Sequence, residues 1–141
     1  MIRGSWTTTV HRPVEETFDY LADLANEPEW NPDASNVRRT SDGPVGLGTT
    51  WEEDYARVGH YVTTIDAYDR PRTLGFDARN PRTDAHVVFR FAPAGDSSTE
   101  VSCEIELTMK GFMRVVEPLV APMIRRQIET ERPKTLRAAL G

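Results

Sequence analysis

The spacing of apolar residues changes along the chain and divides it into elements. Residues 2–10 are rich in Ile, Val, Thr and Trp, which is typical of a strand. Apolar residues then recur at helical spacing at Val14, Phe18, Leu21 and Leu24. Pro13 stands where a first-turn proline fits, and "EPEWNPD" allows one short helical turn before Pro32. We therefore expect a strand followed by two short helices.

From about residue 35 to residue 109, apolar and polar residues alternate. Turn-forming segments divide this part into 35–41, 48–57, 60–69, 73–79, 84–92 and 99–109. The last segment places Val101, Cys103, Ile105, Leu107 and Met109 on one face. Six strands joined by short turns form an antiparallel meander, and the alternation indicates that one face of the sheet is buried.

A helical pattern returns after Gly111 and predicts a helix of up to 28 residues. Its broad apolar stripe comprises Phe112, Val115, Val116, Leu119, Val120, Met123, Ile124, Ile128, Leu136 and Leu140. Pro118, Pro122 and Pro133 each remove a backbone hydrogen bond, so we expect kinks or a segmented start of the helix. This helix has to cover the buried face of the sheet, because no other long element is predicted.

Four segments, taken in this order, resemble a known family. They are "RPVEETFDYLADLANEPEWNPD", "TSDGPVGLGTTW", "IDAYDRPRTLGF" and "GFMRVVEPLVAPMIRRQIE". Together they resemble the polyketide cyclase/dehydrase family of the START-like (SRPBCC, Bet v type) superfamily. The resemblance implies an α+β helix-grip fold in a single domain, residues 1–141, with a curved seven-stranded antiparallel sheet around the long C-terminal helix. It also implies an apolar cavity between sheet and helix, entered near the second short helix.

The third predicted strand, "TTWEEDYAR", carries the main candidates for acid–base chemistry. Trp51, Glu53 and Tyr55 share one face of this strand. If the two aromatic residues point inward, Glu53 lies in the cavity, where burial raises a carboxyl pKa. Glu53, with Tyr55, is then a candidate general acid or base, or an anchor for a ligand hydroxyl. The alternative is a bulge that turns Glu53 into water.

Other inward-facing residues are candidate ligand contacts. Trp30, in the stiff segment between two prolines, either packs at the junction of helices and sheet or contacts a ligand. Tyr61 and Thr63 either offer hydrogen bonds inside the cavity or are ordinary strand residues. The remaining candidates are Trp51, Tyr55, Phe76, Phe89, Cys103, Met109, Phe112, Val116 and Met123. Met109, Phe112 and Met123 are expected at the start and on the inner face of the long helix, with plain core packing as the alternative.

Charge and spacing argue against several other kinds of site. The formal net charge of -5 disfavours nucleic acid as a partner. His11, His60 and His86 form no metal-binding motif, so we expect neither a metal nor another cofactor. Cys103 is the only cysteine, which excludes an intrachain disulfide and leaves an inert buried thiol as the simplest interpretation. The chain lacks a signal-peptide pattern and any run of about 18 apolar residues, so we expect a cytoplasmic protein without membrane insertion.

Three functions are compatible with these features. The first is binding of a small hydrophobic molecule, aromatic, polyketide-like or lipid-like, in the cavity. The second is an aromatase/cyclase or dehydratase that moves protons with Glu53 and Tyr55 or Tyr61. The third is an interaction module, which requires an exposed apolar patch. The sequence leaves open whether the protein is an enzyme, which ligand it binds, and whether it is a monomer or a homodimer.

Overall fold

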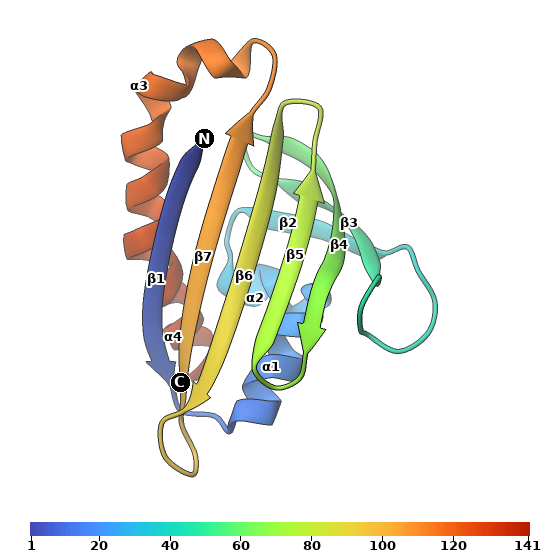
Figure 1. Cartoon of the computed structure of the whole chain (residues 1–141), viewed down its shortest axis with the longest axis vertical. Helices are drawn as coiled ribbons and strands as arrows, with labels where there is room; N and C mark the ends of the chain where they lie inside the picture. Colours follow the sequence, from blue (N-terminus) through green and yellow to red (C-terminus); the bar gives the residue numbers. More distant parts are fainter.

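The sheet contains all the strands of the protein. The computed structural model describes residues 1–141 and contains β1 (Ile2–Val10), β2 (Ala34–Arg39), β3 (Thr50–Tyr55), β4 (Gly59–Asp69), β5 (Thr73–Arg79), β6 (Thr83–Pro93) and β7 (Thr99–Met109). They form one seven-stranded antiparallel sheet in the order β1-β7-β6-β5-β4-β3-β2 (Figure 1). The meander of six strands is confirmed, and β1 joins its last strand. Together with the helices described below, this is the expected α+β helix-grip fold.

Strict alternation in β1 shows why the sheet has a buried face. Its residues alternate between buried and exposed from Ile2 to Val10, as the period of a strand requires. The strand β4 carries an irregularity between Ile65 and Ala67. Opposite this bulge lies Gly75, where an added Cβ would come within 2.6 Å of Asp66 Oδ1 and 2.9 Å of Ala67 Cβ. Glycine therefore permits the close approach that the bulge needs.

Three short helical segments connect β1 to β2. They are α1 (Val14–Ala22), the 3-10 turn η1 (Leu24–Asn26) and α2 (Glu27–Trp30). The first helix ends before Leu24, earlier than its apolar spacing suggests, because Asp23 adopts an extended conformation. The side chain of Asp23 accepts a hydrogen bond from Ala25 N at 3.0 Å and so starts the next turn. The short turn expected at Trp30 is α2.

The C-terminal helix is divided into three parts. They are α3 (Met113–Arg126), the π-helical turn η2 (Gln127–Glu131) and α4 (Arg132–Leu140). Pro133 explains the interruption, because it has no N–H and its ring would clash with the carbonyl of Glu129 in a regular helix. A π turn relieves this conflict by widening the helix locally. Pro118 and Pro122 lie inside α3 without dividing it, so the segmentation comes later than expected.

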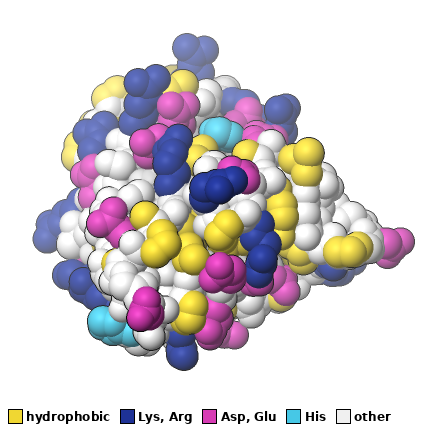
Figure 2. Space-filling view, turned by 60° about the horizontal axis from the view of Figure 1, so that its bottom comes forward, with side chains coloured by type: hydrophobic (Ala, Val, Ile, Leu, Met, Phe, Trp, Pro, Cys, Tyr) yellow, Lys and Arg dark blue, Asp and Glu magenta, His cyan; other side chains and the backbone are white.

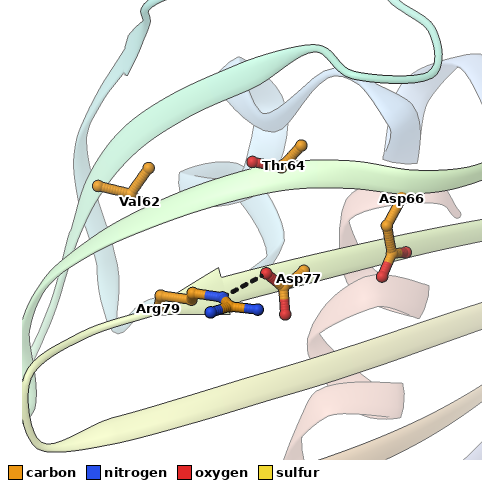
Figure 3. Close-up of a pocket in the computed structure, with 5 residues that line it drawn as sticks. All are labelled: Val62, Thr64, Asp66, Asp77 and Arg79. Atoms are coloured by element: carbon orange, nitrogen blue, oxygen red, sulfur yellow. Dashed lines mark hydrogen bonds and ion pairs between the residues drawn. The ribbon is translucent and has the colours of Figure 1, made fainter.

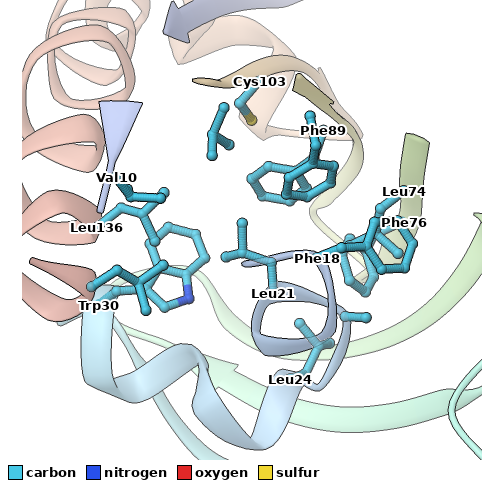
Figure 4. Close-up of a cluster of buried hydrophobic side chains, with 14 of the residues drawn as sticks. Val10, Phe18, Leu21, Leu24, Trp30, Leu74, Phe76, Phe89, Cys103 and Leu136 are labelled. Atoms are coloured by element: carbon cyan, nitrogen blue, oxygen red, sulfur yellow. The ribbon is translucent and has the colours of Figure 1, made fainter. Parts of the chain in front are cut away.

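A cluster of aromatic side chains packs on the inner face of the sheet, where α1, α2 and α4 cover it (Figure 4). Phe89 stands at its centre, with ring centroids of Trp6, Trp30 and Phe76 between 6.2 and 6.3 Å away in edge-to-face geometry. Leu136 of α4 is 0% exposed and belongs to the same cluster. This part of the interior is solid.

The helix α3 is packed differently, since none of its residues is buried. Its exposed apolar side chains are Val115, Leu119 and Met123, and Phe112 precedes them. The expectation that Phe112 and Met123 lie on the inner face is wrong, because they are 78% and 60% exposed. The helix runs beside the edge strand β1 (Figure 1), where Arg125 Nε donates to Arg3 O at 3.0 Å. The side of α3 that carries Phe112 and Met123 consequently points to solvent.

The surface mixes both signs of charge. Figure 2 shows acidic and basic side chains interspersed with small apolar areas over the face that it displays. Among the helices, none combines the length and the apolar character needed to span a lipid bilayer.

Candidate functional site

The inner face of β3 and β4 carries a row of buried polar groups. Glu53 is 1% exposed, so it points inward between Trp51 and Tyr55, as its position in the strand predicts. The hydroxyl of Thr63, on the neighbouring strand, donates to Glu53 Oε1 at 2.9 Å. No bulge turns Glu53 into water. A buried carboxyl group therefore lies in the interior.

A second carboxyl group comes from the short helix α2. Glu27 is 6% exposed, and its Oε2 accepts hydrogen bonds from Tyr55 OH at 2.5 Å and from Asn31 Nδ2 at 3.1 Å. The remaining oxygens, Glu27 Oε1 and Glu53 Oε2, are buried without a hydrogen-bond partner. Two carboxyl groups from distant parts of the sequence thus meet beside Tyr55.

Burial determines the acidity of this cluster. It raises the pKa of Glu53 well above its ordinary value of 4.5, and the charge of Glu27 raises it further. Burial likewise raises the pKa of Tyr55, with the charges of Glu27 and Glu53 adding to the effect. Both groups therefore favour their protonated forms and can donate hydrogen bonds.

A neighbouring polar network joins this cluster to the C-terminal helix. Asp33 Oδ2 accepts from Arg132 at 2.7 Å and from Gln127 Nε2 at 3.0 Å. Gln127 belongs to the π turn, so the wider turn brings its amide to the segment that follows α2. The network ties α4 to the short helices at the same end of β3.

The sequence pattern did not single out Glu27. The segment "NEPEW" was expected to form a short turn, but no feature assigned its polar residues to the interior. One signal was available, because Glu27 and Trp30 are three residues apart and so share a face of a helical turn. If Trp30 packs inward, Glu27 does too, and Trp30 is 7% exposed.

The other candidate residues occupy different places. Trp30, Trp51, Phe76, Phe89 and Cys103 belong to the aromatic core, and burial raises the pKa of the Cys103 thiol. Tyr61 is buried, and its hydroxyl bonds that of Thr83. Met109 is 5% exposed and Val116 is half-buried. Of the candidates, Glu53, Tyr55 and Thr63 therefore meet in one hydrogen-bonded cluster.

Two hollows of the molecule have a mostly polar lining. One, of about 450 Å³, lies on the outer face over β4 and β5, lined by Val62, Thr64, Asp66, Asp77 and Arg79 (Figure 3). The other, of about 520 Å³, lies between the end of β7 and the start of α3, and its lining is Met1, Thr108, Met109, Lys110, Gly111, Arg114 and Glu117. Neither is the expected apolar cavity. No group of three or more His, Cys, Asp and Glu residues is arranged to hold a metal ion.

Small side chains border the polar cluster on the inner face. The strand register aligns Thr63 with Ala78, Ala78 with Ala85, and Ala85 with Leu107. Ala85 and Leu107 are partly buried, as are Val87 and Ile105 in the next row. Toward α3 the inner face of the sheet is therefore partly buried, where Val87, Ile105 and Leu107 pack against the edge of the aromatic core.

One protein-family model matches nearly the whole chain. The family model described as polyketide cyclase / dehydrase and lipid transport matches residues 1–138. No curated protein sequence matches the chain.

Solved structures resemble the fold at low sequence identity. A START superfamily protein from Mycobacterium smegmatis has a TM-score of 0.71 at 17% identity, over 99% of this chain and 97% of that one. The Zhui aromatase/cyclase from Streptomyces has a TM-score of 0.75 at 12% identity, over 98% and 90%. A protein from Thermus thermophilus has a TM-score of 0.76 at 12% identity, over 97% and 93%. At these identities the similarity establishes the fold.

Proposed function

The chain belongs to the polyketide cyclase/dehydrase and lipid transport family, and on that premise we propose that it binds a small hydrophobic molecule between the inner face of the sheet and the C-terminal helix. The ligand is of an aromatic, polyketide-like or lipid-like class. Family and fold are consistent both with binding of a hydrophobic ligand and with polyketide cyclase activity.

The observation that carries this proposal is the incomplete cover of the inner face beside α3. Val87, Ile105 and Leu107 are only partly buried, although they continue the same inward rows as the buried core. Across from them, α3 buries no residue of its own. An apolar molecule placed there would remove from water the remaining exposed area of these side chains and of Val116 on α3, which gains roughly 25 cal/mol for each Å² buried.

Neighbouring valines on α3 provide a matched test. Val116 is half-buried and Val115 is 71% exposed. The probe is anilinonaphthalene sulfonate, followed by its fluorescence and by the rise in melting temperature that a ligand of the folded state produces. We expect Val116→Asn to weaken binding by roughly tenfold and Val115→Asn to leave it unchanged. Absence of binding, or equal loss in both variants, contradicts the proposed site.

Identification of the natural ligand requires the protein from its own host. Native mass spectrometry of protein purified from that source should show a co-purifying small molecule that is lost under denaturing conditions. A mass that matches the bare chain in every preparation counts against a stably bound ligand.

The polar cluster favours a second candidate function, an aromatase/cyclase or dehydratase. A cyclase needs a shaped apolar site and one or two proton-transfer groups, and Glu53 with Tyr55 or Tyr61 provides such groups. Glu53→Gln separates the two functions. A binder should retain its affinity within about tenfold. An enzyme that uses Glu53 should lose turnover by roughly a hundredfold or more, without loss of folded protein.

A further inference from the structure

Two buried carboxyl oxygens without partners, one from Glu53 and one from Glu27, bear on how this pair of residues is protonated. Glu53 Oε2 and Glu27 Oε1 are both buried and both lack a partner, and the two carboxyl groups are in contact. Each group's other oxygen already accepts a hydrogen bond, from Thr63 in one case and from Tyr55 and Asn31 in the other. Two ionised carboxylates in this position would repel each other in a poorly solvated interior.

One proton removes the conflict. We propose that Glu27 and Glu53 hold a single proton between Glu53 Oε2 and Glu27 Oε1, and that this carboxyl pair is the acid and base of the site. Glu53, with its proton, donates to Glu27, whose carboxylate then accepts three hydrogen bonds, counting those from Tyr55 and Asn31. Both unpartnered oxygens are satisfied by the same hydrogen bond.

The charged and titratable groups around the pair are consistent with one retained proton. Tyr55 on β3 and Tyr61 on β4 both face the pair, and burial raises the pKa of each, so neither adds a negative charge at neutral pH. Arg132 on α4 is the cation whose charge acts on Tyr55 beside the pair, and its guanidinium is held by Asp33 at 2.7 Å. No free positive charge is left to neutralise a second carboxylate.

The pair can act on a bound carbonyl compound, a step that rests on the proposed function. Glu53 would donate its proton to the carbonyl oxygen while Glu27 takes a proton from the neighbouring carbon. The C–H electron pair becomes the C=C bond of an enol, and the C=O bond becomes C–O–H. Return of both protons restores the ketone and the pair, so no oxidant, reductant or metal is needed.

Carbon-13 NMR of the glutamate carboxyl groups tests the shared proton without any ligand. We expect one carboxyl resonance of the native protein to keep the chemical shift of a protonated group at pH 7. It should disappear in Glu53→Gln, and Glu27→Gln should shift its titration to lower pH, because an amide can donate to Glu53 in place of the proton. If all glutamate carboxyl groups of the native protein are ionised at pH 7, the proposal is wrong.

Deuterium exchange tests the acid–base role. The probe is phenylacetone in D₂O, with proton NMR used to follow exchange at the carbon next to the carbonyl. We expect the native protein to accelerate exchange and Glu53→Gln and Glu27→Gln each to reduce that acceleration by roughly a hundredfold. Glu29→Gln and Glu52→Gln are the matched controls, since Glu29 is exposed on the same helix and Glu52 lies on the outer face of the same strand.

The melting temperature in the presence of each probe distinguishes failure of the proposed ligand binding from failure of the proposed acid–base pair. If neither phenylacetone nor anilinonaphthalene sulfonate stabilises the fold, the proposed function fails. If phenylacetone binds and exchange is equal in the native protein and Glu53→Gln, the acid–base pair fails while ligand binding stands. Circular dichroism spectra establish that the variants fold. If Glu53→Gln does not fold, Tyr55→Phe replaces it and should reduce exchange, because it removes one of the hydrogen bonds that hold Glu27.

Discussion

The two regular parts of the C-terminal helix bury very different surfaces. The helix α4 contributes Leu136 and Leu140 to the aromatic core, whereas α3 contributes no buried residue and exposes Val115, Leu119 and Met123. Both carry an apolar stripe, so composition alone does not explain the contrast. Position does, because α4 packs across β1 and against α2, while α3 runs beside the edge of the sheet (Figure 1). The part of the sheet beside α4 accordingly carries the buried core, and the part beside α3 is only partly buried.

The largest expected effect is the loss of stability when a leucine of α4 is shortened to alanine, compared with the same change in α3. Leu136 is 0% exposed and Leu119 is 82% exposed. We expect Leu136→Ala to lower the free energy of unfolding by about 2–5 kcal/mol and Leu119→Ala to change it by less than about 0.5 kcal/mol. Urea denaturation measures both. Similar losses in the two variants would mean that α3 is covered in solution, for example by a second molecule.

A smaller effect is expected where the two parts meet. An added Cβ at Gly4 of β1 would lie 2.9 Å from Ile128 Cγ2 in the π turn. We expect Gly4→Ala to cost about 1–3 kcal/mol of unfolding free energy, because close-packed interiors tolerate extra atoms poorly.

Shortening the opposing side chain provides the control. The double variant Gly4→Ala, Ile128→Val should recover part of the loss, which a double-mutant cycle measures. Strictly additive effects would show that the clash is not the cause.

The smallest effect, counted for each pH unit, is the change in unfolding free energy that the carboxyl pair causes. Because the folded protein holds the Glu53 proton above pH 4.5 and the unfolded chain releases it there, stability falls as pH rises above that value. The slope is at most about 1.4 kcal/mol for each pH unit. Glu53→Gln should lose this part of the slope, and Glu29→Gln should follow the native protein. Urea denaturation at a series of pH values compares the three, and equal slopes in all of them would contradict the shared proton.

How much the sequence could predict depended on the type of element. In the strands, a period of two placed Trp51, Glu53 and Tyr55 on one face, but spacing alone left open whether that face, and Thr63 beside it, points inward, which the burial of Glu53 and Thr63 now decides. On the C-terminal helix the apolar stripe is so broad that it is compatible with several rotations, and Phe112 and Met123 were placed on the wrong side. Glu27 was missed because its partners, Tyr55 and Glu53, come from a strand that local patterns do not connect to α2.

The π turn sets the rotation of α3 about the helix axis relative to α4. A π turn contains one residue more than an α turn, and one residue corresponds to about 100° of rotation about the helix axis. Loss of a single residue within Gln127–Glu131 would therefore turn all of α3 about its axis while leaving α4 seated in the core. The exposed and half-buried rows of α3 would then change places. The length of this one turn, and not any residue of α3, decides which row of α3 side chains faces the partly buried half of the sheet.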